Sequence, residues 1–164
     1  MINIFTTGGT FDKIYFDANS EFSIGDSQVE PILQEGNVTA AYSVSSILRK
    51  DSLDITDEDR QAICDCVSAS DATQIIITHG TDTMTVTAAA IAATDVSDKT
   101  IVFIGAMQPA RMRNSDAPFN VGFALAAVQL LPAGIYIAMN GQIFPYDQVI
   151  KNRQAECFES IKPL

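Results

Sequence analysis

Two glycine-rich segments of the sequence carry threonine residues in a setting that suits nucleophilic chemistry. The first is Thr7-Gly8-Gly9-Thr10, and the second is Thr78-His79-Gly80-Thr81-Asp82-Thr83. A threonine hydroxyl can attack a carbonyl carbon when a neighbouring base removes its proton. Glycine lets backbone N–H groups approach a small ligand closely, and a helix beginning near Thr81 would offer further donors to a carboxylate or an oxyanion. The two segments therefore predict a site for attack on a small carbonyl compound.

Lys151, Asp82 and His79 are the titratable residues that could assist such a nucleophile. Lys151 is a candidate base in a dry, crowded site, and Asp82 could pair with the ammonium group of an amino acid. Each feature also has a purely structural interpretation: a Gly-Gly pair can be a turn, Thr81-Asp82 can begin a helix, and Lys151 can lie at the surface. His79 is expected to be a half-buried, hydrogen-bonded structural histidine. Only the joint occurrence of these residues at one sheet edge favours a site.

These residues follow the strands of a predicted α/β fold. Short apolar strands alternate with helical stretches, which is typical of a single-domain, mostly parallel, doubly wound sheet with helices on both faces. The expected strands cover residues 2–6, 39–46, 74–78, 100–104 and 134–139, and the expected helices cover residues 26–35, 57–68, 82–93 and 119–131. Ligands bind beyond the carboxyl ends of the strands in such sheets. The two threonine segments and the loop at Gly105-Ala106-Met107 each follow a strand, so we expect them at one edge.

Length and composition limit what the protein can do. A chain of 164 residues, 47% of them hydrophobic, suits one domain covering residues 1–164. With a net charge of −10, the protein has no overall electrostatic attraction to nucleic acids or to anionic membrane surfaces. No apolar run reaches the roughly 18–20 residues of a membrane span, and the first residues lack the basic region of a signal peptide. We therefore expect a cytoplasmic protein that binds neither nucleic acid nor membrane.

The motifs of metal and nucleotide sites are missing from the sequence. Its cysteines (Cys64, Cys66 and Cys157) and single histidine are too few and too unevenly spaced for a zinc site. Neither the Gly-x-Gly-x-x-Gly nor the Gly-x-x-x-x-Gly-Lys-Ser/Thr phosphate loop occurs, and there is no Gly-x-Ser-x-Gly elbow of a serine hydrolase. We expect no metal and no organic cofactor.

Four segments, in order along the chain, resemble the signature segments of the bacterial-type L-asparaginases. They are Thr7-Gly8-Gly9-Thr10, Asp51-Ser52-Leu53-Asp54-Ile55-Thr56, His79-Gly80-Thr81-Asp82-Thr83 and Gly105-Ala106-Met107-Gln108-Pro109, the last followed by Ser115-Asp116-Ala117-Pro118-Phe119-Asn120. The match runs over residues 2–151. It implies an amidohydrolase that converts L-asparagine to L-aspartate and ammonia by double displacement through an acyl-enzyme, without a cofactor.

The resemblance also implies a role for each matching residue. Thr10 would be the nucleophile, and Thr81 would act with Lys151 and Asp82 in a proton relay. Ser52 would hold the α-carboxylate of the substrate, and Asp82 would hold its α-ammonium group. The remaining substrate contacts would come from Gly9, Gly80, Thr81 and Ala106, whose carbonyl oxygen would face the departing amide. Which threonine attacks in each half-reaction stays open.

Three departures from the family's pattern bear on the site. The tyrosine that activates the first threonine is replaced by Phe22 if the segment at residues 22–25 aligns, which makes Tyr15 the candidate phenol. Leu53 stands at a position that is usually polar, so one contact to the carboxylate is lost. The chain has about half the usual length and resembles short members that consist of the catalytic domain alone. A homodimer or homotetramer could complete its site.

Two other functions fit the same residues. A non-catalytic amino-acid-binding sensor would keep the pocket, although it would need neither a nucleophile nor a base. An amidotransferase subunit would pass ammonia to a partner protein. The choice between asparagine and glutamine is also left open, because one methylene group is worth only about 1–3 kcal/mol.

Overall fold

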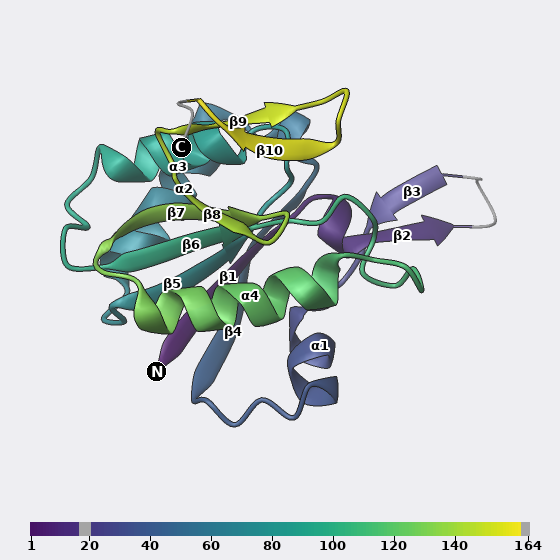
Figure 1. Cartoon of the computed structure of the whole chain (residues 1–164), viewed down its shortest axis with the longest axis horizontal. Helices are drawn as coiled ribbons and strands as arrows, with labels where there is room; N and C mark the ends of the chain where they lie inside the picture. The colour runs from purple at the N-terminus through teal and green to yellow at the C-terminus, as the bar shows by residue number, and fades with distance from the viewer. Residues whose placement is uncertain (17–20, 162–164) are drawn as a thin grey trace.

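A six-stranded sheet lies at the centre of the computed structural model, which describes residues 1–16 and 21–161 (Figure 1). The strand order is β4-β1-β5-β6-β7-β8. These strands are β1 (Ile2–Gly8), β4 (Tyr42–Lys50), β5 (Gln74–Thr78), β6 (Thr100–Ile104), β7 (Gly134–Met139) and β8 (Gln142–Pro145). Neighbouring strands from β4 to β7 pair in parallel, and β8 pairs antiparallel with β7. The predicted mostly parallel sheet is thereby confirmed.

Helices cover both faces of this sheet, so the chain is doubly wound as predicted. The helices α1 (Val29–Glu35) and α4 (Ala117–Leu130) lie on one face, and α2 (Asp57–Ala69) and α3 (Met84–Ala92) lie on the other (Figure 1). Ile75 and Ile77 of β5 pack into the core under α2 and α3, whereas Ile76 packs into the core under α1 and α4. A strand covered on both faces needs apolar residues at every position, which explains the continuous apolar run.

The ends of β5, β6 and β7 match the predicted ones, whereas those of other elements shift. Strand β4 begins at Tyr42 because the preceding Ala40-Ala41 pair has little preference for strand. It extends to Lys50, whose carbonyl oxygen accepts a hydrogen bond from the N–H of Gly9 at 2.8 Å. Helix α3 begins at Met84, two residues later than predicted, because residues 81–83 form a turn. That turn leaves the side chains of Thr81 and Asp82 at the sheet edge.

A capping box fixes the start of α2. The hydroxyl of Thr56 accepts a hydrogen bond from the N–H of Asp59 at 3.2 Å, and the Asp59 carboxylate accepts from the N–H of Thr56 at 2.9 Å. Two N–H groups that the first helical turn leaves unpaired are thereby satisfied. The predicted cap at Thr56 is confirmed.

Two hairpins outside the main sheet were not predicted. Strand β2 (Lys13–Phe16) pairs with β3 (Glu21–Ile24), and β9 (Val149–Asn152) pairs with β10 (Cys157–Ser160). The β2–β3 hairpin projects from one end of the sheet (Figure 1). The β9–β10 hairpin instead packs onto the α2–α3 side of the molecule, where Val149 and Phe158 are buried in the core. Strands of four residues are too short for a clear alternation of apolar and polar side chains.

Candidate active site

Three loops touch one another at the carboxyl ends of β1, β4 and β5. A Cβ atom placed on Gly9 would lie 2.5 Å from the Cα atom of Gly80, and one placed on Gly80 would lie 2.5 Å from the Cβ and Oγ atoms of Ser52. Gly9 also has a φ of +77°, a conformation that L residues rarely adopt. Glycine at position 9 therefore lets the loop after β1 reach the loop after β5, and glycine at position 80 lets the loop after β5 reach the loop after β4.

Lys151, Thr81 and Asp82 form a hydrogen-bonded triad at this edge. The Nζ atom of Lys151 donates to Thr81 Oγ1 at 2.7 Å and to Asp82 Oδ1 at 3.0 Å. The lysine side chain is 18% exposed, and Thr81 is buried. Lys151 lies opposite Phe158 in the β9–β10 register, so the burial of Phe158 in the core anchors the strand that carries the amine. The structure thus brings together three residues that the sequence analysis assigned to one relay.

A cavity of about 260 Å³ opens beside the triad. Its lining residues are Thr10, Thr81, Asp82, Ala106, Met107, Lys151, Arg153 and Glu156. Thr10 begins the short 3-10 helix Thr10–Asp12, and no residue in the described part of the chain hydrogen-bonds its hydroxyl. Sequence reasoning missed Arg153 and Glu156, because their place near the cavity depends on the turn between β9 and β10.

Asp116 and Asn120 hold the loop that carries Ala106. The Asp116 carboxylate accepts a hydrogen bond from the N–H of Met107 at 3.0 Å. The side-chain amide of Asn120 donates to the carbonyl oxygen of Gly105 at 2.9 Å and to Asp116 at 3.0 Å. These bonds fix the backbone on both sides of Ala106, so they hold that residue at the cavity wall. Both side chains lie in the segment that resembles the asparaginases, although no role was predicted for either.

Ser52 and Tyr15 are predicted site residues that do not line the cavity. Ser52 is only 2% exposed and lies against Gly80. Tyr15 lies on β2 and is 54% exposed, with its ring centroid 5.4 Å from that of Phe22 on β3. The hairpin therefore places the phenol against an aromatic neighbour rather than at the triad.

His79 has the expected structural role, although it is fully buried and not half-buried as predicted. Its Nδ1 atom lies 2.8 Å from the carbonyl oxygen of Gly80, and its Nε2 atom lies 2.8 Å from Thr87 Oγ1. A carbonyl oxygen only accepts, so Nδ1 carries the proton and the Thr87 hydroxyl donates to Nε2. Burial lowers the pKa of His79 to about 4. The neutral ring holds the backbone of Gly80 in place.

Asp12 is a buried carboxylate two residues after Thr10. It is 2% exposed, and its Oδ1 atom accepts a hydrogen bond from the N–H of Gln28 at 2.9 Å. Its backbone carbonyl accepts from the N–H of Gly25 at 2.9 Å. Burial raises the pKa of Asp12 from 3.8 to about 6. Asp12 therefore ties the segment that carries Thr10 to the chain that leaves the β2–β3 hairpin.

Replacing Asp12 with asparagine is expected to stabilise the protein at neutral pH. Because the pKa of Asp12 is higher in the folded state, the folded protein binds more protons than the unfolded chain between about pH 4 and pH 6. The free energy of unfolding therefore falls as the pH rises through this window, by roughly 3 kcal/mol at most. The neutral Asp12→Asn side chain keeps an acceptor for Gln28 without this loss. Urea unfolding at pH 7 should show a gain of about 1–3 kcal/mol, and an unchanged pH dependence would contradict the prediction.

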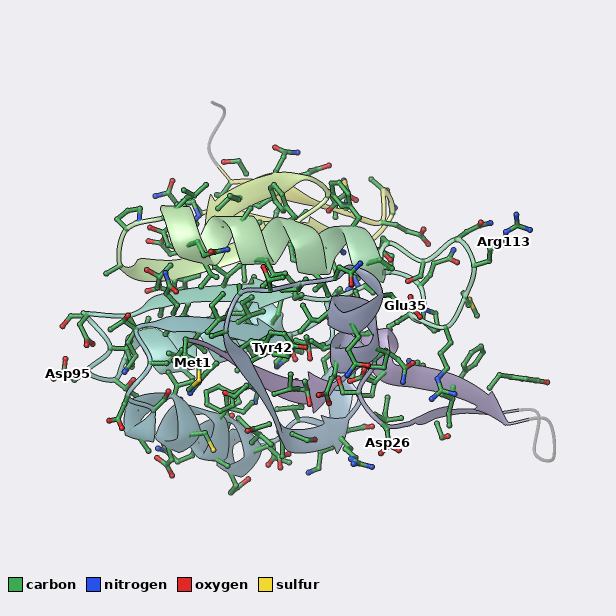
Figure 2. The ribbon with its side chains drawn as sticks, turned by 90° about the horizontal axis from the view of Figure 1, so that it is seen from below. Met1, Asp26, Glu35, Tyr42, Asp95 and Arg113 are labelled. Carbon is green, nitrogen blue, oxygen red and sulfur yellow. The ribbon has the colours of Figure 1, made fainter. Side chains whose placement is uncertain are left out.

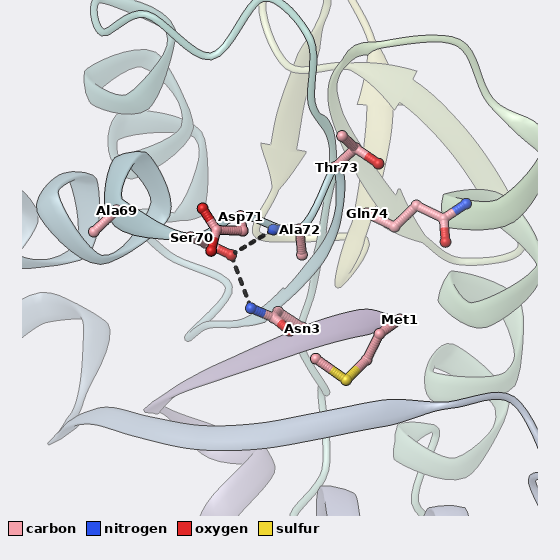
Figure 3. Close-up of a pocket in the computed structure, with 8 residues that line it drawn as sticks. All are labelled: Met1, Asn3, Ala69, Ser70, Asp71, Ala72, Thr73 and Gln74. Atoms are coloured by element: carbon pink, nitrogen blue, oxygen red, sulfur yellow. Dashed lines mark hydrogen bonds between the residues drawn. The ribbon is translucent and has the colours of Figure 1, made fainter.

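A larger hollow, of about 510 Å³, involves the amino ends of β1 and β5 (Figure 3). It is lined by Met1, Asn3 and residues 69–74. The side-chain amide of Asn3 donates to Ser70 Oγ at 2.8 Å, and the Ser70 hydroxyl also accepts from the N–H of Ala72 at 3.2 Å (Figure 3). The amide of Asn3 and the hydroxyl of Ser70 are thus paired within the protein, and none of the predicted site residues lines this hollow. We place the candidate active site at the smaller cavity, which holds the nucleophile and base candidates.

Residues 1–16 and 21–161 contain neither a cluster of metal-ligating side chains nor a membrane-spanning helix. Within these ranges, no three His, Cys, Asp or Glu side chains gather as metal ligands would. Helix α4 has 14 residues, fewer than the roughly 20 that a membrane span needs. No helix in these ranges has the length and apolar composition needed to cross a bilayer.

Comparisons with known proteins place the chain in one family. Residues 1–163 match the family model described as Asparaginase, N-terminal. A probable periplasmic L-asparaginase of Haemophilus influenzae is 29% identical, over 92% of this chain and 46% of the relative. A glutaminase-asparaginase of Acinetobacter glutaminasificans is 33% identical, over 77% of this chain and 40% of the relative. The structure of a probable cytoplasmic L-asparaginase of Campylobacter jejuni is 29% identical with a TM-score of 0.82, over 97% of this chain and 52% of that one.

The matches cover most of this chain but only about half of each relative. The chain spans about half the length of the curated relatives it matches. The family model, in contrast, covers nearly the whole sequence, including all four segments that carry the resemblance. The chain therefore belongs to the asparaginase N-terminal family.

Proposed function

We propose that this protein is an L-asparaginase, which hydrolyses the side-chain amide of L-asparagine to give L-aspartate and ammonia. The observation that carries the proposal is the 2.7 Å hydrogen bond between Lys151 Nζ and Thr81 Oγ1, beside a cavity that Thr10 also lines. The Asp82 carboxylate lies 3.0 Å from the same nitrogen. A sensor would need neither a nucleophile nor a base, so this arrangement favours catalysis.

The proposed reaction has two half-reactions. In the first, the hydroxyl oxygen of Thr10 attacks the amide carbon, and the relay of Thr81, Lys151 and Asp82 moves the hydroxyl proton to the amide nitrogen. The C–N bond then breaks, ammonia leaves, and the acyl group remains as an ester on Thr10. In the second, water attacks the ester, L-aspartate leaves, and the Thr10 oxygen regains a proton. Thr81 is the alternative nucleophile in either step.

Substrate recognition is proposed to use the loops around the cavity. Asp82 pairs with the α-ammonium group, and Ser52 contacts the α-carboxylate. The backbone of Gly9, Gly80 and Thr81 offers N–H donors, which suit a carboxylate or an oxyanion. The carbonyl oxygen of Ala106 accepts a hydrogen bond from the departing amide. The bonds from Asp116 and Asn120 support this role, because they fix the loop that carries Ala106.

Tyr15 is proposed as the phenol that assists Thr10. Strand β2 follows directly on the Thr10–Asp12 helix, so a movement of the β2–β3 hairpin would shift the phenol relative to the nucleophile. Under this proposal, Tyr15→Phe lowers kcat at least tenfold. An unaffected kcat would leave Tyr15 with the packing role against Phe22.

The proposal also covers the oligomeric state and the cellular location of the protein. We propose a homodimer or homotetramer that needs no metal or organic cofactor. A cytoplasmic location rests on the sequence, since the similar proteins include a probable periplasmic and a probable cytoplasmic asparaginase. Sedimentation velocity would report the oligomeric state, and a monomer would contradict that part of the proposal.

Ammonia release from L-asparagine tests the proposed function. The wild-type protein should release ammonia and L-aspartate in equal amounts, and Thr10→Ala should lower kcat by roughly 10³-fold or more because the ester cannot form. The control is Thr39→Ala, the same change at an exposed position outside the cavity. No ammonia from folded wild-type protein would refute the function, and calorimetric binding of L-asparagine without turnover would support the sensor. The same assay with L-glutamine compares the two amides.

A further inference from the structure

Arg153 lies at the cavity and, within the described part of the chain, makes a single long ionic contact. Its Nη2 atom is 3.5 Å from Asp82 Oδ1, and its side chain is 70% exposed. Lys151 approaches the same oxygen at 3.0 Å with a side chain that is 18% exposed, and it also donates to Thr81. Ion pairs between exposed groups contribute little to stability. Arg153 can therefore leave Asp82 at little cost, whereas Lys151 is held in place.

Asp82 thus faces two cations through one carboxylate oxygen before a substrate binds. The ammonium group of an amino acid that approached Asp82 would bring a third positive charge. Of the two resident cations, Arg153 is the one with the longer contact and the greater exposure. Binding of the ammonium group should therefore displace the guanidinium from Asp82.

On the basis of the proposed function, we infer that Arg153 recognises the α-carboxylate of the substrate and so determines specificity for an α-amino acid. The ammonium and carboxylate groups of such a substrate are bonded to the same carbon. An ammonium group on Asp82 consequently places the carboxylate close to the displaced guanidinium. A guanidinium binds a carboxylate through two parallel N–H···O bonds. The contact of Arg153 with Asp82 is exchanged for a contact with the substrate.

The charges around the cavity fit this exchange. Among the described residues that line it, the acidic ones are Asp82 and Glu156 and the basic ones are Lys151 and Arg153. Such a lining, balanced between two acids and two bases, matches a zwitterion that carries one charge of each sign. The match is notable in a chain with 20 acidic and 10 basic residues.

Ser52 alone is a weak partner for the carboxylate. Its hydroxyl is neutral, and the residue is 2% exposed and does not line the cavity. The next residue, Leu53, has an apolar side chain that is 65% exposed. Arg153 supplies the full positive charge that neither of these residues offers.

Comparing two amide substrates shows whether Arg153 recognises the α-carboxylate or another part of the molecule. L-asparagine carries the α-carboxylate, and 3-aminopropanamide is the same molecule without it. We expect Arg153→Gln to lower kcat/KM for L-asparagine at least tenfold, chiefly through KM, and to lower the preference for L-asparagine over 3-aminopropanamide by a similar factor. Arg153→Lys should recover part of this preference because it restores the charge. The matched control is Arg113→Gln, whose side chain points away from the body of the molecule on the loop between β6 and α4 (Figure 2).

The outcomes separate this inference from the proposed function. If wild-type protein releases ammonia but Arg153→Gln keeps the preference within twofold, the inference is overturned and the function stands. Equal losses for both amides, carried by kcat, would also overturn it, because Arg153 would then act on the relay rather than on the carboxylate. Where 3-aminopropanamide is not hydrolysed, its inhibition constant against L-asparagine replaces its kcat/KM in the comparison. No ammonia from the wild-type protein would refute the function, and the inference with it.

Discussion

A Lys151→Met variant is expected to lose roughly 10³-fold in kcat for L-asparagine while folding like the wild type. Methionine keeps an unbranched side chain that fills similar space, but it offers no amine to Thr81 or Asp82. The contacts that disappear are the hydrogen bonds of 2.7 Å and 3.0 Å to those two residues. Ammonia release at saturating L-asparagine, with circular dichroism as the check on folding, measures the effect.

Lys50→Met is the matched control for this variant. Lys50 lies on β4, and its Nζ atom pairs with Asp59 at 2.7 Å on a partly exposed surface. Loss of such a surface pair costs little stability, so kcat should stay within twofold of the wild type. Near-normal turnover in Lys151→Met would remove the lysine from the mechanism.

Gly9→Ala is expected to lower both stability and activity. The added Cβ atom would lie 2.5 Å from the Cα atom and 2.6 Å from the nitrogen of Gly80, and backbone atoms cannot rotate away as a side chain would. The φ of +77° adds a cost of about 1–2 kcal/mol for a residue with a Cβ atom, and crowding adds about 1–3 kcal/mol. Gly80 directly precedes Thr81, so its displacement also moves the hydroxyl that Lys151 contacts. Urea unfolding should show a loss of at least about 2 kcal/mol, and kcat should fall with it.

Gly122→Ala is the matched control, because it makes the same change in side chain at a position that is not crowded. Gly122 lies within α4, and a Cβ atom there would meet no described atom within 4 Å beyond its chain neighbours and the nearby backbone of its own helix. Alanine favours a helix over glycine by about 0.5–1 kcal/mol, so this variant should be slightly more stable and fully active. A Gly9→Ala protein as stable as Gly122→Ala would contradict the close approach of the two loops.

The central sheet could be predicted because local sequence and environment agree there. Ile75, Ile76 and Ile77 are β-branched and apolar, and they lie in a strand that is covered on both faces. A continuous apolar run of this length is also what such a strand requires. At Ala40-Ala41 the predicted strand began too early, because this pair has little preference for strand and the pairing with β1 begins only at Tyr42, opposite Ile2.

The candidate site could be predicted by residue type but not by arrangement. Thr81 and Asp82 directly follow a recognisable strand, so their edge of the sheet could be inferred. Lys151 lies 70 residues further along, on a four-residue strand whose partner was not expected. Arg153 and Glu156 gain their place only from the turn of that hairpin, which no local pattern predicts. The position of Tyr15 against Phe22 likewise depends on a hairpin formed by two short strands.

The β9–β10 hairpin also bears on how activity would be lost on heating. Within the described sheets, β9 and β10 pair only with each other, and Val149 and Phe158 attach them to the core. Detaching the hairpin exposes far less apolar surface than melting the six-stranded sheet, so it should open at a lower free energy. Lys151 would then leave Thr81 while the rest of the fold persisted. On heating, activity should therefore be lost reversibly at a lower temperature than that at which the sheet melts. The rate of turnover would then measure the fraction of molecules in which the β9–β10 hairpin is docked.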